Sequence, residues 1–222
     1  MGGYGWDVLV AGFPAGAFQT NCYVVATGAG EACIVVDPGQ DAVEPLEALL
    51  EQHRLTPVAV LLTHGHFDHT FSVTPVCDGH GIPRLDPPGR PRHARRSHEG
   101  PLPGVGGVLR RKLEMREPRE VRELTDGTDL TLAGITLRVD HAPGHTQGSV
   151  VFTTPTDEGV DVMFAGDTLF AGSIGRTDLP GGDHQQLLRS LQQVFLTRDD
   201  TAIVLPGHGS TTTVGRNVPR TR

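Results

Sequence analysis

The sequence predicts a mixed α/β fold in which two β-sheets pack face to face and helices cover their outer sides. Short runs rich in Val and Ile recur between glycine-containing turns, which is typical of β-strands. Strand-like runs followed by an amphipathic helix occur in both halves of the chain. With 222 residues, 37% of them hydrophobic, the chain can form a single domain over residues 1–222 with a sizeable core.

The first half is expected to run from strands through a helix into a buried strand. Val- and Ile-rich runs predict strands at 6–10, 21–27 and 32–37. Apolar side chains at helical spacing predict a helix over 41–54, and Asp41 and Glu44 have the spacing of a capping box at its start. The continuous apolar run 57–63 has the composition of a strand that is buried on both faces.

The middle of the chain contains a long stretch without regular periodicity. We expect a short helix over 68–80 and a strand over 82–85 before it. The stretch itself, at about 86–120, is rich in Pro, Gly and Arg. A structureless segment of this length is uncommon inside a domain unless it is functional. We interpret it as a surface excursion or a flap near a site, rather than as a linker between domains.

The second half repeats the order of strands and a helix. Runs rich in β-branched residues predict strands at 129–134, 135–142, 149–154 and 161–167, and a type I′ or II′ turn would join the first two. A helix is expected over 183–196, with Asp183 as its N-cap and apolar side chains along one side. One more strand and a loop follow at 202–209.

Composition and charge argue against several classes of protein. The net charge of −7 and the lack of a long basic run do not fit a general nucleic-acid binder. The three cysteines form no CxxC pair, which fits a reducing compartment better than a disulfide framework. The N-terminus has no signal-peptide pattern, and no run reaches the ~18 apolar residues of a membrane span, so we expect a cytoplasmic protein.

The stretch VLLTHGHFDHT, residues 60–70, places several ionisable side chains directly after a predicted strand. His64 and His66 are two positions apart, so on extended backbone their side chains point the same way. Asp68 and His69 follow at the start of the expected helix. Because α/β proteins place their sites beyond the carboxyl ends of strands, this turn is a candidate site. The simpler alternative is a polar loop that follows a buried strand.

Three further His or Asp residues lie in or beside glycine-containing turns that follow strand-like runs. They are His145 in APGHTQGS, Asp167 in FAGDTLF and His208 in LPGHG. A histidine taken alone is more often exposed or hydrogen-bonded than a metal ligand. With the first four residues, however, the set contains five imidazoles and two carboxylates, which converge if the strand ends meet at one edge. The combination favours a metal site over a polar loop.

Imidazole and carboxylate ligands without thiolate suit zinc, iron or manganese, and the lack of thiolate argues against a structural zinc. Seven such ligands are too many for one tetrahedral ion and fit two divalent ions with one bridging carboxylate. Ions ~3.5–4 Å apart lower the pKa of bound water towards ~7 and produce a hydroxide nucleophile at neutral pH. We expect zinc, with iron or manganese as alternatives.

The series THGHFDH, PGHTQGS, AGDTLF and PGHG, in this order, resembles the metallo-β-lactamase superfamily over nearly the whole chain. The resemblance implies an αββα sandwich with the metal ions at one edge of the two sheets. By motif, it implies that one ion is held by His64, His66 and His145. It also implies a second ion at Asp68, His69 and His208, and a bridging Asp167. Asp68 and Asp167 would then act in catalysis together with a metal-bridging hydroxide.

Within the superfamily, the sequence resembles the short single-domain glyoxalase II branch. The matching segments are GFPAGAFQTNCYVV, IVVDPGQ and AGDTLFAGSIGRTD. This resemblance implies a hydrolase that converts an S-2-hydroxyacyl thiol ester and water to a 2-hydroxy acid and a thiol. It also implies that Arg176 contacts the thiol part of this small-molecule substrate. Where the branch has an aromatic residue two positions later, this chain has Asp178, so the thiol need not be glutathione.

Other reactions of the superfamily stay open as alternatives. A persulfide dioxygenase with one iron, held by two histidines and one aspartate, is the main one, because its turn also contains a GRTD-like sequence. A β-lactamase is disfavoured by the lack of a secretion signal. A nuclease would use arginines of the 86–120 stretch, and a non-catalytic metal-binding protein would be favoured only if ligands were missing.

Neighbours of these motifs are candidates for orienting the ligand histidines. Asp37 and Thr63 each end a predicted strand, and either could form a hydrogen bond with a ligand imidazole. Thr63 could equally do no more than end its strand. His141, four positions before His145, is a third candidate for this orienting role.

Overall fold

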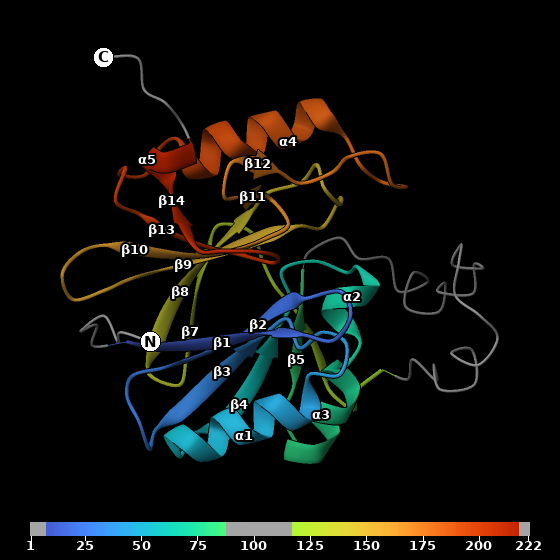
Figure 1. Cartoon of the computed structure of the whole chain (residues 1–222), viewed down its shortest axis with the longest axis vertical. Coiled ribbons are helices and arrows are strands. Elements are labelled where there is room, and N and C mark those ends of the chain that lie inside the picture. The colour runs from blue at the N-terminus through green and yellow to red at the C-terminus, as the bar shows by residue number, and fades with distance from the viewer. Residues whose placement is uncertain (1–7, 88–116, 218–222) are drawn as a thin grey trace.

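The computed structural model describes residues 8–87 and 117–217, and in it two six-stranded sheets lie face to face between helices (Figure 1). The first sheet has the order β1 (Leu9–Ala15), β2 (Thr20–Ala26), β3 (Ala32–Val36), β4 (Thr56–Leu61), β5 (Arg84–Asp86) and β6 (Val121–Glu123). The second has the order β14 (Thr212–Thr213), β13 (Ile203–Pro206), β10 (Asp161–Gly166), β9 (Val150–Pro155), β8 (Ile135–His141) and β7 (Thr128–Leu132). Both sheets mix parallel and antiparallel pairs, so the predicted αββα sandwich of two mixed sheets is confirmed.

Helices cover both outer faces of the sandwich. The first sheet is covered by α1 (Val43–His53) and α3 (Val73–His80), and the second by α4 (His184–Ser190), the π-helical turn η2 (Leu191–Phe195) and α5 (Val214–Asn217). The short helix α2 (Phe67–Thr70) follows β4, and a small hairpin of β11 (Leu169–Phe170) and β12 (Ser173–Ile174) follows β10. Among the described residues, no helix has the length and hydrophobicity that a membrane crossing requires.

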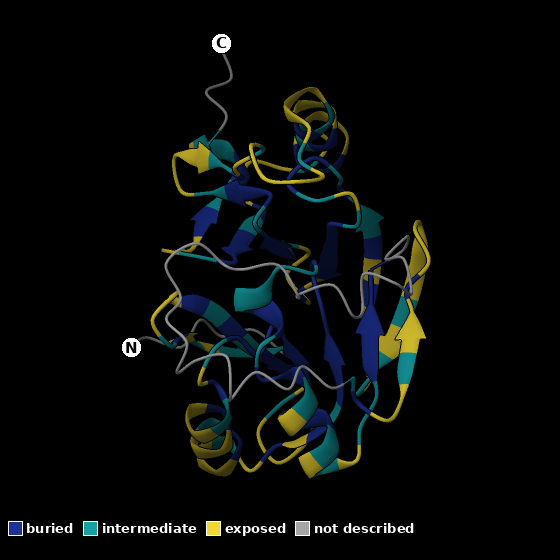
Figure 2. Cartoon of the chain, turned by 90° about the vertical axis from the view of Figure 1, so that its right-hand side faces the viewer, coloured by how far each residue is buried: buried dark blue, intermediate teal, exposed yellow. Residues whose placement is uncertain are grey.

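Three buried layers of apolar side chains hold the sandwich together, and Figure 2 shows the buried strands at its centre. Alternate residues of one strand serve different layers: Val25 packs between the sheets, whereas Val24 packs towards α1 and α3. In the second sheet, Phe164 packs between the sheets and Met163 towards η2 and α5. Strands of this kind are apolar on both faces, which explains the continuous hydrophobic runs in the sequence.

Most of the predicted elements are present within a few residues of the expected bounds. The turn between β7 and β8 is of type I′, because Ala133 and Gly134 have φ angles of 50° and 75°. The first strand lies later than predicted, over Leu9–Ala15, and residues 1–7 are outside the described part of the chain. Of the predicted excursion at 86–120, residues 88–116 are outside the described part as well.

The helix predictions need three corrections. The predicted capping box is wrong: Asp41 has a φ of 54°, and α1 begins with Ala42 as its N-cap, whose N–H donates to Ser72 Oγ at 3.2 Å. The single helix expected at 68–80 is divided into α2 and α3. The helix expected at 183–196 is α-helical only to Ser190 and then continues as η2. Its predicted N-cap is confirmed, since Asp183 Oδ1 accepts the N–H of Gln186 at 2.9 Å.

The topology brings several strand ends to one edge of the sandwich. Strand β4 ends shortly before His64, β10 directly before Asp167, and β13 shortly before His208. The two sheets are joined at this edge, because Thr20 and His208 form an isolated antiparallel bridge and Asn21 N donates to Gly207 O at 2.7 Å. The three loops therefore meet between the sheets.

Candidate metal centre

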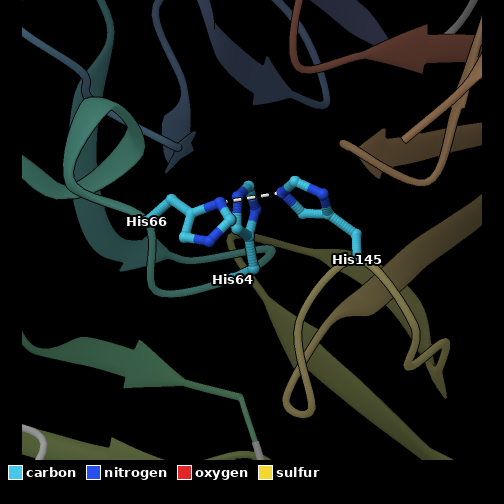
Figure 3. A group of neighbouring side chains, drawn as sticks. All are labelled: His64, His66 and His145. Atoms are coloured by element: carbon cyan, nitrogen blue, oxygen red, sulfur yellow. Dashed lines mark hydrogen bonds between the residues drawn. The ribbon is translucent and has the colours of Figure 1, made fainter. Parts of the chain in front are cut away.

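The loops at this edge bring together all seven residues that the sequence singles out. Two groups have ligand atoms that all lie within 4.8 Å of one another, namely His64, His66 and His145, and Asp68, His69 and His208. In Figure 3, His64 and His66 come from the loop after β4, and His145 faces them from the loop after β8. The prediction that these residues converge is thus met by the geometry.

Asp167 lies between the two groups. Its Oδ2 is 3.6 Å from His145 Nε2 in the first group and 3.6 Å from His208 Nε2 in the second. Its Oδ1 is 3.3 Å from His69 Nε2. One carboxylate thus contacts histidines of both groups, which is the geometry that a bridging ligand requires.

Hydrogen bonds fix which nitrogen of two buried histidines faces the centre. His69 Nδ1 donates to Asp37 Oδ2 at 2.9 Å, and Thr63 Oγ1 donates to the same oxygen at 2.5 Å. Since the Thr63 hydroxyl proton is used in that bond, His64 Nδ1 donates to Thr63 Oγ1 at 3.1 Å. The Nε2 atoms of both rings are therefore free of protons in the neutral form. The hydrogen bonds expected from Asp37 and Thr63 to histidines of the centre are thus present.

Three buried atoms of the centre have no hydrogen-bond partner, namely His64 Nε2, His69 Nε2 and Asp167 Oδ1. All three are lone-pair atoms, and native proteins rarely leave such atoms unsatisfied. A cation would satisfy all three at once. The donor set, which contains imidazole and carboxylate, matches the ligands that zinc, iron and manganese accept. The residues present therefore fit a metal centre.

Asp37 forms a further group with His64 and His69, but its oxygens are already in use. In addition to Thr63 Oγ1 and His69 Nδ1, its carboxylate accepts the N–H of Thr63 at 2.8 Å. The contact runs through the Nδ1 side of His69, away from the unpartnered Nε2. Asp37 thus positions the histidines rather than offering a further metal ligand.

The Nδ1 atom of His145 is held by the loop that follows β12. His145 Nδ1 donates to the backbone oxygen of Arg176 at 2.8 Å, and its Nε2 lies 2.8 Å from His66 Nδ1. The sequence did not indicate this role for the Arg176 backbone, because it depends on a loop 31 residues away. His141, the other predicted positioning residue, contacts Gln147 O at 2.8 Å instead.

The histidines of the centre have strongly shifted pKa values. Burial, together with the neighbouring histidines, holds the pKa of His64 well below its usual value. Burial and His145 lower the pKa of His66 to about 4. For His69, burial lowers the pKa, but Asp37 and Asp167 more than offset it and raise the value to about 10. His64 and His66 are thus kept neutral, as metal ligands must be.

The two carboxylates are held in their charged form. Burial raises the pKa of Asp68, but the hydrogen bond from His208 and the charge of His69 outweigh it and lower the pKa to about 2. Burial likewise opposes the ionisation of Asp167, yet its close contact with His69 and the charges of the surrounding histidines lower its pKa. Burial lowers the pKa of His208, while Asp68 and Asp167 raise it above the usual value. The centre thus combines permanent negative charge with free lone pairs.

Glycine at position 207 lets the backbone pass against the centre. A Cβ atom there would meet Asp167 Oδ1 and lie 2.6 Å from His69 Cε1. Gly175 approaches in the same way, since its Cβ would meet the backbone oxygen of Asp167. These contacts give a physical reason for glycine beside the motif residues.

The predicted substrate residue, Arg176, lies at the rim of the centre. Its side chain is 61% exposed and is engaged by the carboxylate of Asp178. Thr20 was not singled out from the sequence, although its hydroxyl lies 3.5 Å from Asp68 Oδ2. Only the pairing of Thr20 with His208 across the two sheets reveals its position.

Comparisons with known proteins agree with this fold and centre. The chain is 48% identical over 94% of both chains to an uncharacterized protein of Mycobacterium leprae (strain TN). It is 33% identical to hydroxyacylglutathione hydrolase GloC of Haemophilus influenzae, over 91% of this chain and 92% of that protein. Two solved structures share the fold and more than a third of the sequence. They are BLEG-1 B3 metallo-beta-lactamase (TM-score 0.75, 38% identity, 94% and 95% of the chains) and TTHA1623 in a di-iron-bound form (TM-score 0.70, 35% identity, 92% and 96%).

The sequence model of the Metallo-beta-lactamase superfamily matches residues 15–208, which include all seven residues of the centre. This range reaches from the end of β1 to the loop after β13 and thus covers most of both sheets. Together with the nearly full-length relatives, it shows that the chain belongs to the metallo-beta-lactamase superfamily.

Proposed function

We propose that this protein is a metal-dependent hydrolase of thioesters, similar to glyoxalase II, which converts an S-2-hydroxyacyl thiol ester to a 2-hydroxy acid and a thiol. The observation that carries the proposal is the paired centre, in which one carboxylate, Asp167, contacts histidines of both groups. The nearly full-length similarity to a hydroxyacylglutathione hydrolase supports the choice of substrate class. The substrate is then a small molecule rather than a nucleic acid, and we propose a cytoplasmic location.

In this proposal the two groups each hold one divalent ion, most simply zinc. His64, His66 and His145 would hold the first, Asp68, His69 and His208 the second, and Asp167 would contact both. The di-iron form of the 35% identical TTHA1623 supports two ions, and it keeps iron as an alternative. When bound, the ions would supply a hydroxide nucleophile at neutral pH and stabilise charge on the acyl oxygen.

The chain's own residues prepare the centre for this chemistry. Asp37 and Thr63 hold the Nε2 atoms of His64 and His69 towards the centre, so that neither ring must rotate to offer this nitrogen. The side chain of Asp68 is 22% exposed and that of Asp167 is 12% exposed, so solvent reaches Asp68 more easily. The thiol that is released has a pKa near ~8.5, so it can leave as the thiolate without a general acid. The proposed reaction thus requires no separate proton donor.

The test combines metal analysis of the purified protein with thioester hydrolysis. We expect about two metal ions per chain, as two-metal hydrolases hold, and hydrolysis of S-lactoylglutathione or of an S-lactoyl ester of another thiol. A protein that binds metal but hydrolyses no thioester would contradict the proposal. One iron per chain with oxygen uptake on glutathione persulfide would instead indicate a persulfide dioxygenase.

A second candidate is β-lactam hydrolysis, which the 38% identity to BLEG-1 B3 metallo-beta-lactamase favours. The two reactions differ in the leaving group, because the nitrogen of an opened β-lactam must gain a proton, whereas a thiolate need not. The pKa of Asp68 is lowered to about 2, so this carboxylate is not a ready proton donor at neutral pH. A chromogenic cephalosporin separates the candidates: a higher kcat/KM for it than for every thioester would favour the β-lactamase.

A further inference from the structure

The loop 206–209, which carries the ligand candidate His208, has few means of holding its own shape. Pro206 has no N–H, and the two glycines of the loop have no side chain. The side chain of His208 is 30% exposed, and its Nε2 lies 3.1 Å from Asp68 Oδ2 within the centre. Among the described residues, the His208 ring has no hydrogen-bond partner outside the centre. The position of this histidine must therefore be set through its backbone.

Two residues of β2 hold that backbone from the other sheet. Asn21 donates from Nδ2 to Pro206 O at 3.0 Å and to Gly209 O at 2.9 Å. Its backbone N–H donates to Gly207 O at 2.7 Å. The hydroxyl of Tyr23 donates to Pro206 O at 2.8 Å. Carbonyl groups on both sides of the histidine are thus held by donors that lie 183 to 188 residues earlier in the chain.

These donors stand on a rigid part of the fold. Strand β2 pairs with β1 on one side and with β3 on the other. The ring of Tyr23 also packs edge-on against Phe164 of the second sheet, with ring centroids 5.7 Å apart. Because a site supported by strands is held more precisely than a site on loops alone, β2 can fix the loop 206–209 relative to the centre.

We propose that Asn21 and Tyr23 are positioning residues that hold His208 in place for the second metal ion. This inference rests on the paired metal centre of the proposed function and adds two residues to it. Without these donors, the loop 206–209 would also adopt positions in which the histidine faces away. The apparent Kd of a site rises as the fraction of chains in the binding conformation falls. The affinity for the second ion should therefore decrease, whereas the first ion, whose ligand candidates lie on other loops, should be unaffected.

The test measures zinc affinity and does not depend on turnover. Competition with a chelating indicator, well below the denaturation temperature, should resolve two dissociation constants in the wild type. Asn21→Ala should raise one of them about tenfold or more, as expected for a residue that orients a ligand, and leave the other unchanged. Tyr23→Phe keeps the ring and loses only the hydroxyl. It should raise the same constant about two- to tenfold, which corresponds to one typical hydrogen bond.

Two further backgrounds identify the affected site. In His208→Ala, the substitution Asn21→Ala should have no further effect on zinc affinity, because the loop then carries no ligand. In His66→Ala, which removes a ligand candidate of the first group, the effect of Asn21→Ala should persist. The same effect in both backgrounds would overturn the inference.

Asn217→Ala is the matched control. Asn217 Nδ2 donates to Thr212 Oγ1 at 3.1 Å and to Thr213 O at 3.0 Å, and its Oδ1 accepts the N–H of Gly172 at 2.7 Å. This amide also joins separate segments, but none of these partners belongs to the loop 206–209. The variant should lower the thermal denaturation midpoint and leave both dissociation constants unchanged. A merely structural role would give Asn21→Ala the same result.

Unchanged constants in Asn21→Ala and Tyr23→Phe, an equal rise of both constants, or an equal rise in Asn217→Ala would overturn the inference. So would a wild type that binds no second zinc ion. If Asn21→Ala does not fold, Tyr23→Phe decides. Two bound zinc ions without hydrolysis of any thioester would contradict the proposed function alone, and the dissociation constants would still decide the inference.

Discussion

The Nδ1 atom of His66 lies 2.8 Å from the Nε2 atom of His145, although 79 residues separate the two in the sequence. Because His145 Nδ1 already donates to the backbone oxygen of Arg176, the shared proton is carried by His66 in the neutral pair. In the other neutral tautomer of His66 the proton lies on Nε2, and then two lone pairs face each other beside the unpartnered Nε2 of His64. Three nitrogen ligands are thereby offered to one ion.

Removal of metal with a chelator should abolish hydrolysis, and readdition of zinc should restore it. Because bound ions stabilise only the folded state, free metal at 100 times its Kd should add about 2.7 kcal/mol to the free energy of unfolding for each site. Thermal denaturation with and without metal measures this difference. The same midpoint for both forms, together with unchanged turnover, would rule out a metal centre at these residues.

Replacing the bridging candidate by Asp167→Ala should reduce turnover by at least about 100-fold, because both groups lose their shared carboxylate. The metal content measured by mass spectrometry should fall below that of the wild type. Full activity with an unchanged metal content would show that Asp167 is not a ligand.

Asp37→Asn tests whether this residue positions the histidines. The variant keeps the shape of the side chain and tolerates the φ of 49°, but it loses the charged acceptor that holds His69 Nδ1 and Thr63 Oγ1. We expect metal affinity to fall about 10- to 100-fold, as for other residues that orient ligands. Competition with a chelating indicator measures the affinity.

Asp41→Asn is the matched control for that experiment. Asp41 has a similar φ of 54°, is exposed and lies outside the centre, so the same substitution should leave metal affinity unchanged. An equal loss in both variants would mean that the effect comes from the backbone or from net charge rather than from contact with His69.

Gly207→Ala should weaken metal binding at least about tenfold, because the new methyl group displaces the Asp167 carboxylate or the His69 ring. Gly79→Ala serves as the comparison. Gly79 lies in helix α3, and a Cβ atom added there would meet nothing within 4 Å. That change should leave metal affinity intact and stabilise the helix by up to about 1 kcal/mol. Tight metal binding by Gly207→Ala would show that the loop gives way more easily than the geometry implies.

The sequence predicted strands such as β3, β9 and β10 well because both of their faces are buried. An apolar run such as 57–63 can be recognised as a strand from its own residues alone. The turn at Ala133 and Gly134 likewise depends only on the backbone angles of these two residues. The start of α1 was missed because its N-cap is satisfied by Ser72, 30 residues away. The short strands β6, β11, β12 and β14 have two or three residues each, too few for a periodic pattern.

The candidate centre was predictable because its members stand beside strand ends that share an edge. Asp37 and Thr63 could be proposed as supports for the same reason. The Arg176 backbone and Thr20 could not, because their contacts with His145 and Asp68 arise only when distant loops meet. Nor does sequence spacing reveal that the Arg176 guanidinium is engaged by Asp178 rather than open to a ligand.

Anomalous diffraction from crystals of the metal-loaded protein tests the central claim most directly. The account predicts two peaks, one among His64, His66 and His145 and the other among Asp68, His69 and His208, with the Asp167 carboxylate between them. Density for an ion at another place, or none at these side chains at saturating metal, would contradict it.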